Sequence, residues 1–201
     1  MATESEIRAA AVAQGQSIKR INMVAAVAFG GLLALILARL WPTGPLGWLA
    51  GLGVGLLYAN AYEYFFHRFL LHRPGSRLTA EHMRHHETVG LAEEALYVNF
   101  FGRPWIVVLV FAVNSLPFIA GEWLLQVGIA PGVLVGFVVY FLASEEIHWR
   151  FHVGGWPGQG RDRLAAWLNA TRAHHLIHHG RNDGRFNVFL PLWDWLFGRP
   201  I

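Results

Sequence analysis

The chain has 201 residues, of which 54% are hydrophobic and only 14% are charged. Soluble domains usually carry about 25% charged residues, so this composition favours a membrane protein with a single domain. Cysteine is absent, which excludes a disulfide framework and a thiolate metal site. The net charge of +3 does not indicate nucleic-acid binding, because nearly all the positive charge is arginine at the ends of apolar segments.

Four apolar segments are candidates for transmembrane helices, each of which needs roughly 20 residues. The first covers residues 21–40 and ends at a turn over 41–45 that contains two prolines and a glycine. The second covers 46–66 and is rich in glycine, which permits close helix packing. The third covers 105–125, and the fourth covers 133–143. The sequence therefore predicts an all-α fold with about four transmembrane helices.

The distribution of basic residues predicts the orientation in the membrane. With a cytoplasmic N-terminus, 15 of the 16 basic residues fall on the cytoplasmic side and only Arg39 falls outside. The fifteen are Arg8, Lys19, Arg20, Arg68, Arg73, Arg77, Arg84, Arg103, Arg150, Arg161, Arg163, Arg172, Arg181, Arg185 and Arg199. Residues 1–20 are expected to be a cytoplasmic N-terminal segment without a cleavable signal, and 21–201 a single membrane-embedded domain.

All 11 histidines fall on the same predicted side, and they form four groups. The groups are His67 with His72, His82 with His85 and His86, His148 with His152, and His174, His175, His178 and His179. Residues three and four apart share a face of a helix. Three sets can therefore each present their rings to one point: His82 with His85 and His86, His148 with His152, and His175 with His178 and His179. His67 and His72 are five apart, so they should diverge on a regular helix and straddle its end.

Any one of these groups alone is as well explained by ordinary amphipathic residues at a membrane interface. Four groups on one side of the membrane, three of them with helix-face spacing, favour a metal centre instead. Ten imidazoles exceed the needs of one ion, because zinc sites usually use four ligands. Two ions with about five ligands each are the simpler arrangement, although imidazole alone does not distinguish zinc, copper, iron and nickel.

The order HX4H, HX2HH, HX3H, HX2HH resembles the fatty acid hydroxylase/sterol desaturase superfamily of integral-membrane di-iron enzymes. The segments EYFFHRFLLH, from Glu63, and NVFLPLWDWLFG, from Asn187, resemble it too, and the resemblance covers residues 58–198. It implies a cytoplasmic helical cap with two metal ions, and it implies that the ten histidines other than His174 are the metal ligands and the catalytic centre. The implied ligands are His67, His72, His82, His85, His86, His148, His152, His175, His178 and His179.

Metal-bound imidazoles usually donate their second N–H to a carboxylate or a carbonyl. Glu63 and Glu145 each lie one turn before a box histidine, and Asp194 lies in the aromatic tail, so all three are candidates for that role. Asp194 is equally suited to cap a short terminal helix. His174 is expected to have a supporting or structural role, although its spacing to His178 would also let it replace His175. The other acidic residues near the second box, Glu81, Glu87, Glu93 and Glu94, are expected to be solvated.

The resemblance implies a lipid hydroxylase acting on a fatty acid or sterol-like substrate from the bilayer. Two iron ions and O2 would carry the reaction, with zinc as a substitute metal in a purified protein. A separate ferredoxin, cytochrome or reductase would supply the electrons. The third box is HX3H, whereas the carotenoid hydroxylases tend to have HX4H. A carotenoid hydroxylase or a lipid desaturase remains the alternative within the superfamily, and a non-enzymatic membrane metal transporter or metal-binding protein is the alternative from another class.

Overall fold

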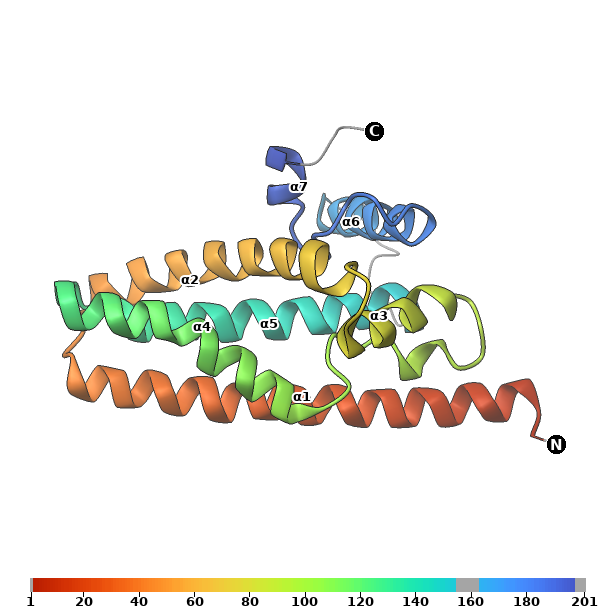
Figure 1. The fold of residues 1–201 in the computed structure, drawn as a ribbon, viewed down its shortest axis with the longest axis horizontal. Coiled ribbons are helices and arrows are strands. Elements are labelled where there is room, and N and C mark those ends of the chain that lie inside the picture. The colour runs from red at the N-terminus through yellow and green to blue at the C-terminus, as the bar shows by residue number, and fades with distance from the viewer. Residues whose placement is uncertain (1, 155–162, 198–201) are drawn as a thin grey trace. The chain divides into compact units, whose positions relative to one another are not determined.

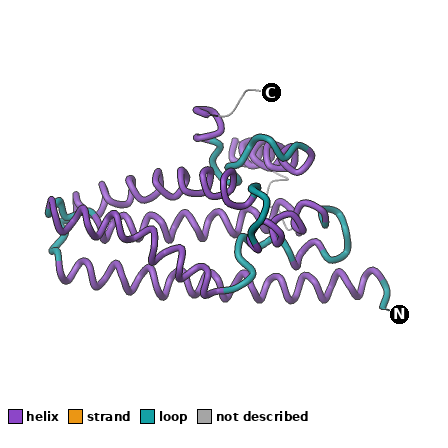
Figure 2. Tube along the Cα trace, in the orientation of Figure 1, coloured by secondary structure: helices purple, strands orange, loops and turns teal. Residues whose placement is uncertain are grey.

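The computed structural model describes residues 2–154 and 163–197, and every regular element within these ranges is a helix (Figures 1 and 2). The all-α prediction is therefore confirmed. Three residues used in the sequence analysis, Arg161, Gly198 and Arg199, lie outside the described ranges.

The chain divides into two compact units. The first consists of Met1–Ser17, Asn60–Gly102 and Ser144–Ile201, and we call it the histidine unit because all 11 histidines belong to it. The second consists of Ile18–Ala59 and Arg103–Ala143, and we call it the apolar unit.

The first helix, α1 (Glu4–Leu40), begins well before the predicted apolar segment. Its start is a capping box: the Thr3 hydroxyl accepts from the Glu6 N–H at 3.3 Å, and the Glu6 carboxylate accepts from the Thr3 N–H at 2.7 Å. With 37 residues and a rise of about 1.5 Å per residue, α1 is about 55 Å long, well beyond a hydrocarbon core of about 30 Å. The predicted N-terminal segment is thus helical from residue 4 onward.

In the apolar unit, α2 (Pro45–Phe66) and α5 (Ala130–Val153) meet along their glycines. A Cβ placed on Gly51 would lie 2.2 Å from the carbonyl oxygen of Ile129, and one on Gly55 would lie 2.2 Å from that of Val133. From the other helix, a Cβ on Gly136 would lie 2.5 Å from the oxygen of Leu52. The glycines therefore allow backbone contact between the helices, as the sequence predicted.

The remaining helix of this unit, α4 (Pro104–Leu125), begins with a proline that needs no N–H partner. It ends at Gln126, whose backbone is left-handed with φ of 50°. The buried Glu122 carboxylate then accepts from the N–H groups of Gly128 at 2.5 Å and of Ile129 and Ala130 at 3.0 Å. These bonds satisfy the first N–H group of α5 and two N–H groups of the turn before it, and they fix the turn between the two helices.

Three helices of the described chain, α1, α4 and α5, are long and apolar enough to cross a membrane. We expected about four. The 22-residue α2 is long enough to cross a membrane, but its glycines and polar residues lower its hydropathy. It is therefore not one of the three candidate spans. The α5 helix also continues to Val153, ten residues beyond the predicted apolar segment, and so carries the third histidine box.

The histidine unit contains the shorter elements. These are a π-helical turn η1 (His67–Leu71), α3 (Arg77–Glu87), a 3₁₀ turn η2 (Glu94–Leu96), α6 (Arg163–Gly180) and α7 (Leu192–Phe197). The α3 helix begins at Ser76, whose hydroxyl accepts from the Thr79 N–H at 3.0 Å. A cluster of Ala11, Ala95, Val98 and Trp149 joins the start of α1 to the η2 segment and to α5 within this unit.

The glycine contact predicts opposite effects for two neighbouring substitutions in α2. Gly55→Ala should lower the thermal unfolding temperature in detergent, because overpacking costs about 1–3 kcal/mol. Gly53→Ala is the matched control, since a Cβ there meets nothing within 4 Å. It should leave the unfolding temperature unchanged or raise it, because alanine is the better helix former by about 1 kcal/mol. Equal effects at the two positions would contradict the packing.

Candidate metal centre

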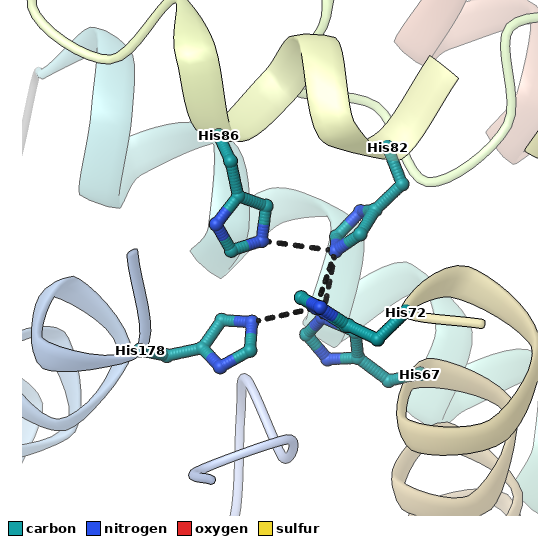
Figure 3. Close-up of side chains that lie close together, drawn as sticks. All are labelled: His67, His72, His82, His86 and His178. Atoms are coloured by element: carbon teal, nitrogen blue, oxygen red, sulfur yellow. Dashed lines mark hydrogen bonds between the residues drawn. The ribbon is translucent and has the colours of Figure 1, made fainter. Parts of the chain in front are cut away.

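The ten histidines expected to bind metal converge in two groups of five, each with its nitrogens within 4.8 Å of one another. The first group, shown in Figure 3, is His67, His72, His82, His86 and His178. The second group is His85, His148, His152, His175 and His179. The groups adjoin, because the rings of His86 and His179 have centroids 4.3 Å apart.

The spacing of the nitrogens fits a metal ion. In the first group, the Nε2 of His72 lies 3.2 Å from that of His67, 3.0 Å from that of His82 and 3.1 Å from that of His178. A metal–imidazole bond of about 2.1 Å places two ligand nitrogens about 3.0 Å apart when they subtend a right angle. The observed separations therefore match neighbouring ligands of one ion.

The second group has the same spacing. The Nε2 of His175 lies 2.9 Å from that of His152 and 3.0 Å from that of His179, and the Nε2 of His148 lies 3.1 Å from that of His85. His85, His148 and His175 are each no more than 2% exposed. Neither group contains a carboxylate, so imidazole is the only ligand type that these groups offer.

A π-helical turn brings the first two histidines together. The His72 N–H donates to the carbonyl of His67, five residues earlier, at 3.2 Å. This wider turn places the two rings with centroids 5.0 Å apart, whereas a regular α-helix would direct them apart. The prediction that the pair straddles a helix end is therefore confirmed, because His72 lies at the end of this helical turn.

The two HX2HH boxes are each divided between the groups. His82 and His86 belong to the first group, but His85 belongs to the second; His175 and His179 belong to the second group, but His178 belongs to the first. The prediction that the rings of one box meet at one point was wrong for these two boxes, but it is confirmed for His148 and His152, which lie in the same group. Adjacent residues on a helix lie about 100° apart, so consecutive histidines turn toward different groups, while residues four apart stay together. Each box therefore links the two groups.

Backbone carbonyls of the tail fix two rings of the first group. The Nδ1–H of His67 donates to the carbonyl of Phe186 at 2.5 Å, and that of His178 donates to Gly184 at 2.6 Å. Between these carbonyls, Arg185 has a positive φ of 64°, uncommon for a residue with a side chain. With a proton on Nδ1, each ring presents the lone pair of Nε2 to the group, which is the form that binds a metal.

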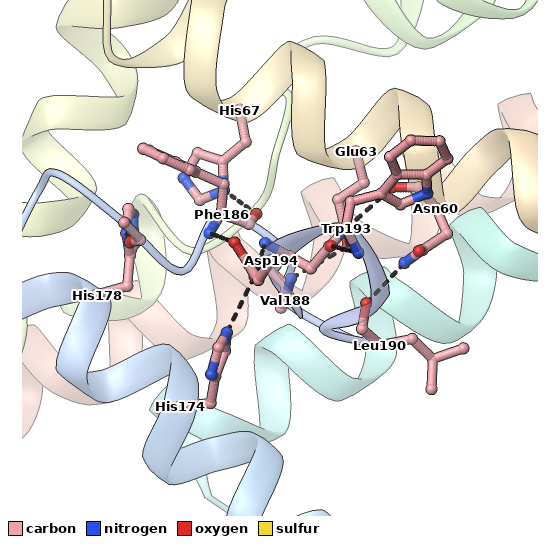
Figure 4. A network of polar contacts seen from close by, with 12 residues as sticks. Asn60, Glu63, His67, His174, His178, Phe186, Val188, Leu190, Trp193 and Asp194 are labelled. Carbon is pink, nitrogen blue, oxygen red and sulfur yellow. Dashed lines mark hydrogen bonds and ion pairs between the residues drawn. The ribbon is translucent and has the colours of Figure 1, made fainter. Parts of the chain in front are cut away.

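Glu63 and Asp194 support this tail segment instead of contacting the rings that we expected them to orient (Figure 4). The Asp194 carboxylate accepts from the N–H groups of Phe186 and Asn187, each at 2.8 Å. The Glu63 carboxylate accepts from the Asn187 side chain and the Val188 N–H, each at 3.1 Å, and from the Ser144 hydroxyl. Both carboxylates thus position the carbonyls that hold His67 and His178.

The other two candidates have separate roles. His174 lies outside both groups, and its Nε2–H donates to the Asp194 carboxylate at 3.0 Å. It therefore supports the tail, in line with the structural role expected of it, and it does not replace His175. Glu145 accepts from the N–H of Phe100 at 3.3 Å, and the ring of Phe100 lies 4.9 Å from that of His148.

One carboxylate beside the site was not among the predicted residues. Glu94, expected to be solvated, is only 8% exposed, and its Oε1 accepts from the Nδ1–H of His152 at 2.8 Å. No local spacing pointed to this pair, because the two residues are 58 positions apart and lie on different elements. The burial of Glu94 can be recognised only from the tertiary structure.

At least seven of the ten rings are neutral at physiological pH, because burial lowers the pKa of each. Burial lowers the pKa of His72 to about 4, that of His86 to about 3 and that of His179 to about 2. Burial is also the largest cause that lowers the pKa of His67, His82, His85 and His175 well below the usual value. A neutral imidazole has a free lone pair, so every one of these rings is ready to bind a cation.

A cavity of about 190 Å³ reaches the two groups within the histidine unit. His82 of the first group and His85 and His148 of the second lie in its wall. The rest of the wall is Glu81, Arg84, Leu96, Tyr97, Val98, Asn99, Phe100 and Gly102. A small part of a ligand can therefore approach both groups through a cavity whose wall contains apolar side chains and the charged side chains of Glu81 and Arg84.

Comparison with known proteins agrees with this site. The fatty acid hydroxylase family model matches residues 52–199, so the chain belongs to the fatty acid hydroxylase family. Among curated proteins, the fatty acid 2-hydroxylase of Mus musculus is 29% identical over 150 residues, which cover 72% of this chain. The matched region spans only 37% of that relative's length. No solved structure matches the chain significantly.

The tail network predicts that two neighbouring substitutions differ. Asp194→Ala removes the acceptor of two buried N–H groups and should weaken metal binding by the first group by about tenfold, because it loosens the carbonyls behind His67 and His178. His174→Ala is the control, since it leaves both N–H bonds in place and should change the affinity less. Competition with a metal chelator, followed by elemental analysis of the protein, measures both. A larger loss in His174→Ala would contradict the network.

Proposed function

We propose that the protein is an O2-dependent hydroxylase of fatty acids or fatty-acyl lipids that uses two iron ions held by the ten histidines. The two adjoining groups of five imidazoles are the single observation that carries this proposal. Membership of the fatty acid hydroxylase family supports the substrate class. The name of the mouse relative supports hydroxylation of a fatty acid, although the two chains share only 29% identity.

The proposed chemistry requires a redox-active metal, and we propose iron because the family resemblance implies it. Oxidation of an unactivated C–H bond by O2 needs a redox-active centre, and zinc has no redox chemistry. Two bound iron ions would supply the activation of O2 and the transfer of electrons to it. The balanced reaction consumes the C–H compound, O2, two electrons and two protons, and it yields the alcohol and water. Zinc can still occupy the site in a purified protein, because imidazole sites bind it more tightly than Fe²⁺.

The protein's own residues hold and shield this centre. Phe186, Gly184 and Glu94 keep the protons of three rings on Nδ1, so that their Nε2 atoms face the ions. The buried rings of the second group keep water away from one side of the centre. The 190 Å³ cavity beside His82, His85 and His148 is where we place the reacting carbon. It holds only a short part of a lipid, so most of the acyl chain would lie outside it.

We further propose that the N-terminus and the histidines face the cytoplasm, because that orientation places 15 of the 16 basic residues on the cytoplasmic side. The lipid substrate would then come from the bilayer, and the two electrons would come from a separate cytoplasmic ferredoxin, cytochrome or reductase.

A metal transporter is a poorer fit to the same residues. Transporters place their ligands near the middle of the bilayer, between broken helices. Here the box histidines lie at the ends of α2 and α5 or on α3 and α6, none of which is a broken helix. Metal flux in proteoliposomes, without any oxygen-dependent product, would favour the transporter.

Mass spectrometry of lipid extracts, with and without expression, tests the proposed function. Hydroxylation should yield lipids heavier by about 16 Da, whereas desaturation would yield lipids lighter by about 2 Da. The double variant His86→Ala, His179→Ala should abolish the product, because it removes one ligand from each group. Glu87→Ala is the matched control, since this exposed carboxylate is on the same helix as His86 and should leave the product at the wild-type level. Product from the double variant would contradict the proposal.

A further inference from the structure

The hydrogen bond between Glu94 and His152 is the one carboxylate contact that the described residues show for a histidine of either group. The side chain of His152 is 0% exposed and that of Glu94 is 10% exposed. The second carboxylate oxygen of Glu94 accepts from the Gly90 N–H at 2.9 Å, which holds the side chain in place. By contrast, the partners of His67 and His178 are neutral carbonyls.

The other four rings of the second group lack this support. Within the described chain, the buried Nδ1 atoms of His85, His148, His175 and His179 have no hydrogen-bond partner. No hydrogen bond at Nδ1 therefore fixes their orientation, whereas a carboxylate acceptor fixes that of His152. A hydrogen bond to an ionised group is roughly twice as strong as one between neutral groups. Glu94 is thus placed to influence the second group far more than the first.

The start of α1 holds the turn that carries Glu94. Ala11 packs against Ala95 and Val98, and the side chain of Asn99 donates to the carbonyl of Gly15 at 3.0 Å. A Cβ on Gly15 would lie 2.0 Å from the carbonyl oxygen of Ala95, the residue next to Glu94. The helix and the turn are therefore in backbone contact, and no larger residue fits at Gly15 without moving one of them.

A cavity of about 50 Å³ lies at the same place. Arg8 and Val12 of α1 line it together with Glu94 and His152. This part of α1 precedes the apolar segment 21–40, so its contacts here are with the histidine unit. The part of α1 that extends beyond the apolar segment therefore has a role other than crossing the membrane, since it packs against the histidine unit.

We propose that Glu94 is a positioning residue for His152. Residues 8–15 of α1 hold Glu94 in place, and they thereby form part of the second metal site. The two ions are then not equivalent: the ion in the second group depends on Glu94 and on Gly15, and the ion in the first group does not. This inference rests on the proposed function only in requiring that the protein binds two ions.

Metal binding tests the inference independently of activity. Metal-free protein in detergent is titrated with Co²⁺, the absorption of the bound ion is followed, and the metal content is measured by elemental analysis after dialysis against a weak chelator. Glu94→Ala should weaken the second site by about 10–100-fold, the usual cost of losing such a partner, so one ion is retained where the wild type retains two. Glu94→Gln keeps an acceptor oxygen without the charge. The metal affinity of its second site should therefore lie between those of Glu94→Ala and the wild type.

Two controls separate positioning from a general loss of structure. Glu93→Ala removes the neighbouring carboxylate and should retain both ions. Gly15→Ala should lose one ion although Glu94 is intact, whereas Gly31→Ala, on the same helix with nothing within 4 Å of its Cβ, should retain both. Helical content by circular dichroism should be the same in all of these variants.

A double-mutant cycle assigns the lost ion. Adding Glu94→Ala to His152→Ala should cause no further loss, while adding it to His178→Ala should remove the remaining ion. Retention of both ions with unchanged affinity in Glu94→Ala, or loss of both ions together, would overturn the inference and leave the proposed function standing. A wild-type protein that binds fewer than two ions would instead contradict the proposed function.

Discussion

The convergence of neutral imidazole nitrogens is the interaction on which the rest of the structure depends. Rings whose protons are fixed on Nδ1, such as His67 and His178, direct their Nε2 lone pairs toward the other rings of the group at about 3 Å. Two lone pairs at this distance need a proton or a cation between them, and an unsatisfied buried polar group costs about 1–3 kcal/mol. The geometry of the histidine unit therefore suits bound cations, and its loops and carboxylates hold the rings in this geometry.

Helix geometry explains how one short chain forms two sites. Consecutive histidines, His85 with His86 and His178 with His179, turn toward different groups, because adjacent residues on a helix point about 100° apart. The α3 and α6 helices therefore each serve both sites and fix the two groups next to each other. The π-helical turn that starts at His67 solves the remaining problem, since it lets two histidines five residues apart serve the same ion.

The sequence predicted the parts of this site that depend on local spacing. The ten histidines, the apolar helices and the all-α fold followed from periodicity and from the family resemblance. Helix geometry is enough to predict that each HX2HH box divides between the two groups. The prediction was nevertheless wrong, because three-residue and four-residue spacings were treated alike. The π-helical turn has no simple pattern. Glu94 and the carbonyls of Gly184 and Phe186 were beyond reach, since they contact residues 58, 6 and 119 positions away through the tertiary fold.

An anomalous difference map from crystals of the iron-loaded protein, collected at the iron edge, tests the central claim most directly. The account predicts two peaks per chain, one surrounded by the Nε2 atoms of His67, His72, His82, His86 and His178 and the other by those of His85, His148, His152, His175 and His179. A single peak shared by both sets, or two peaks bound by other side chains, would contradict it.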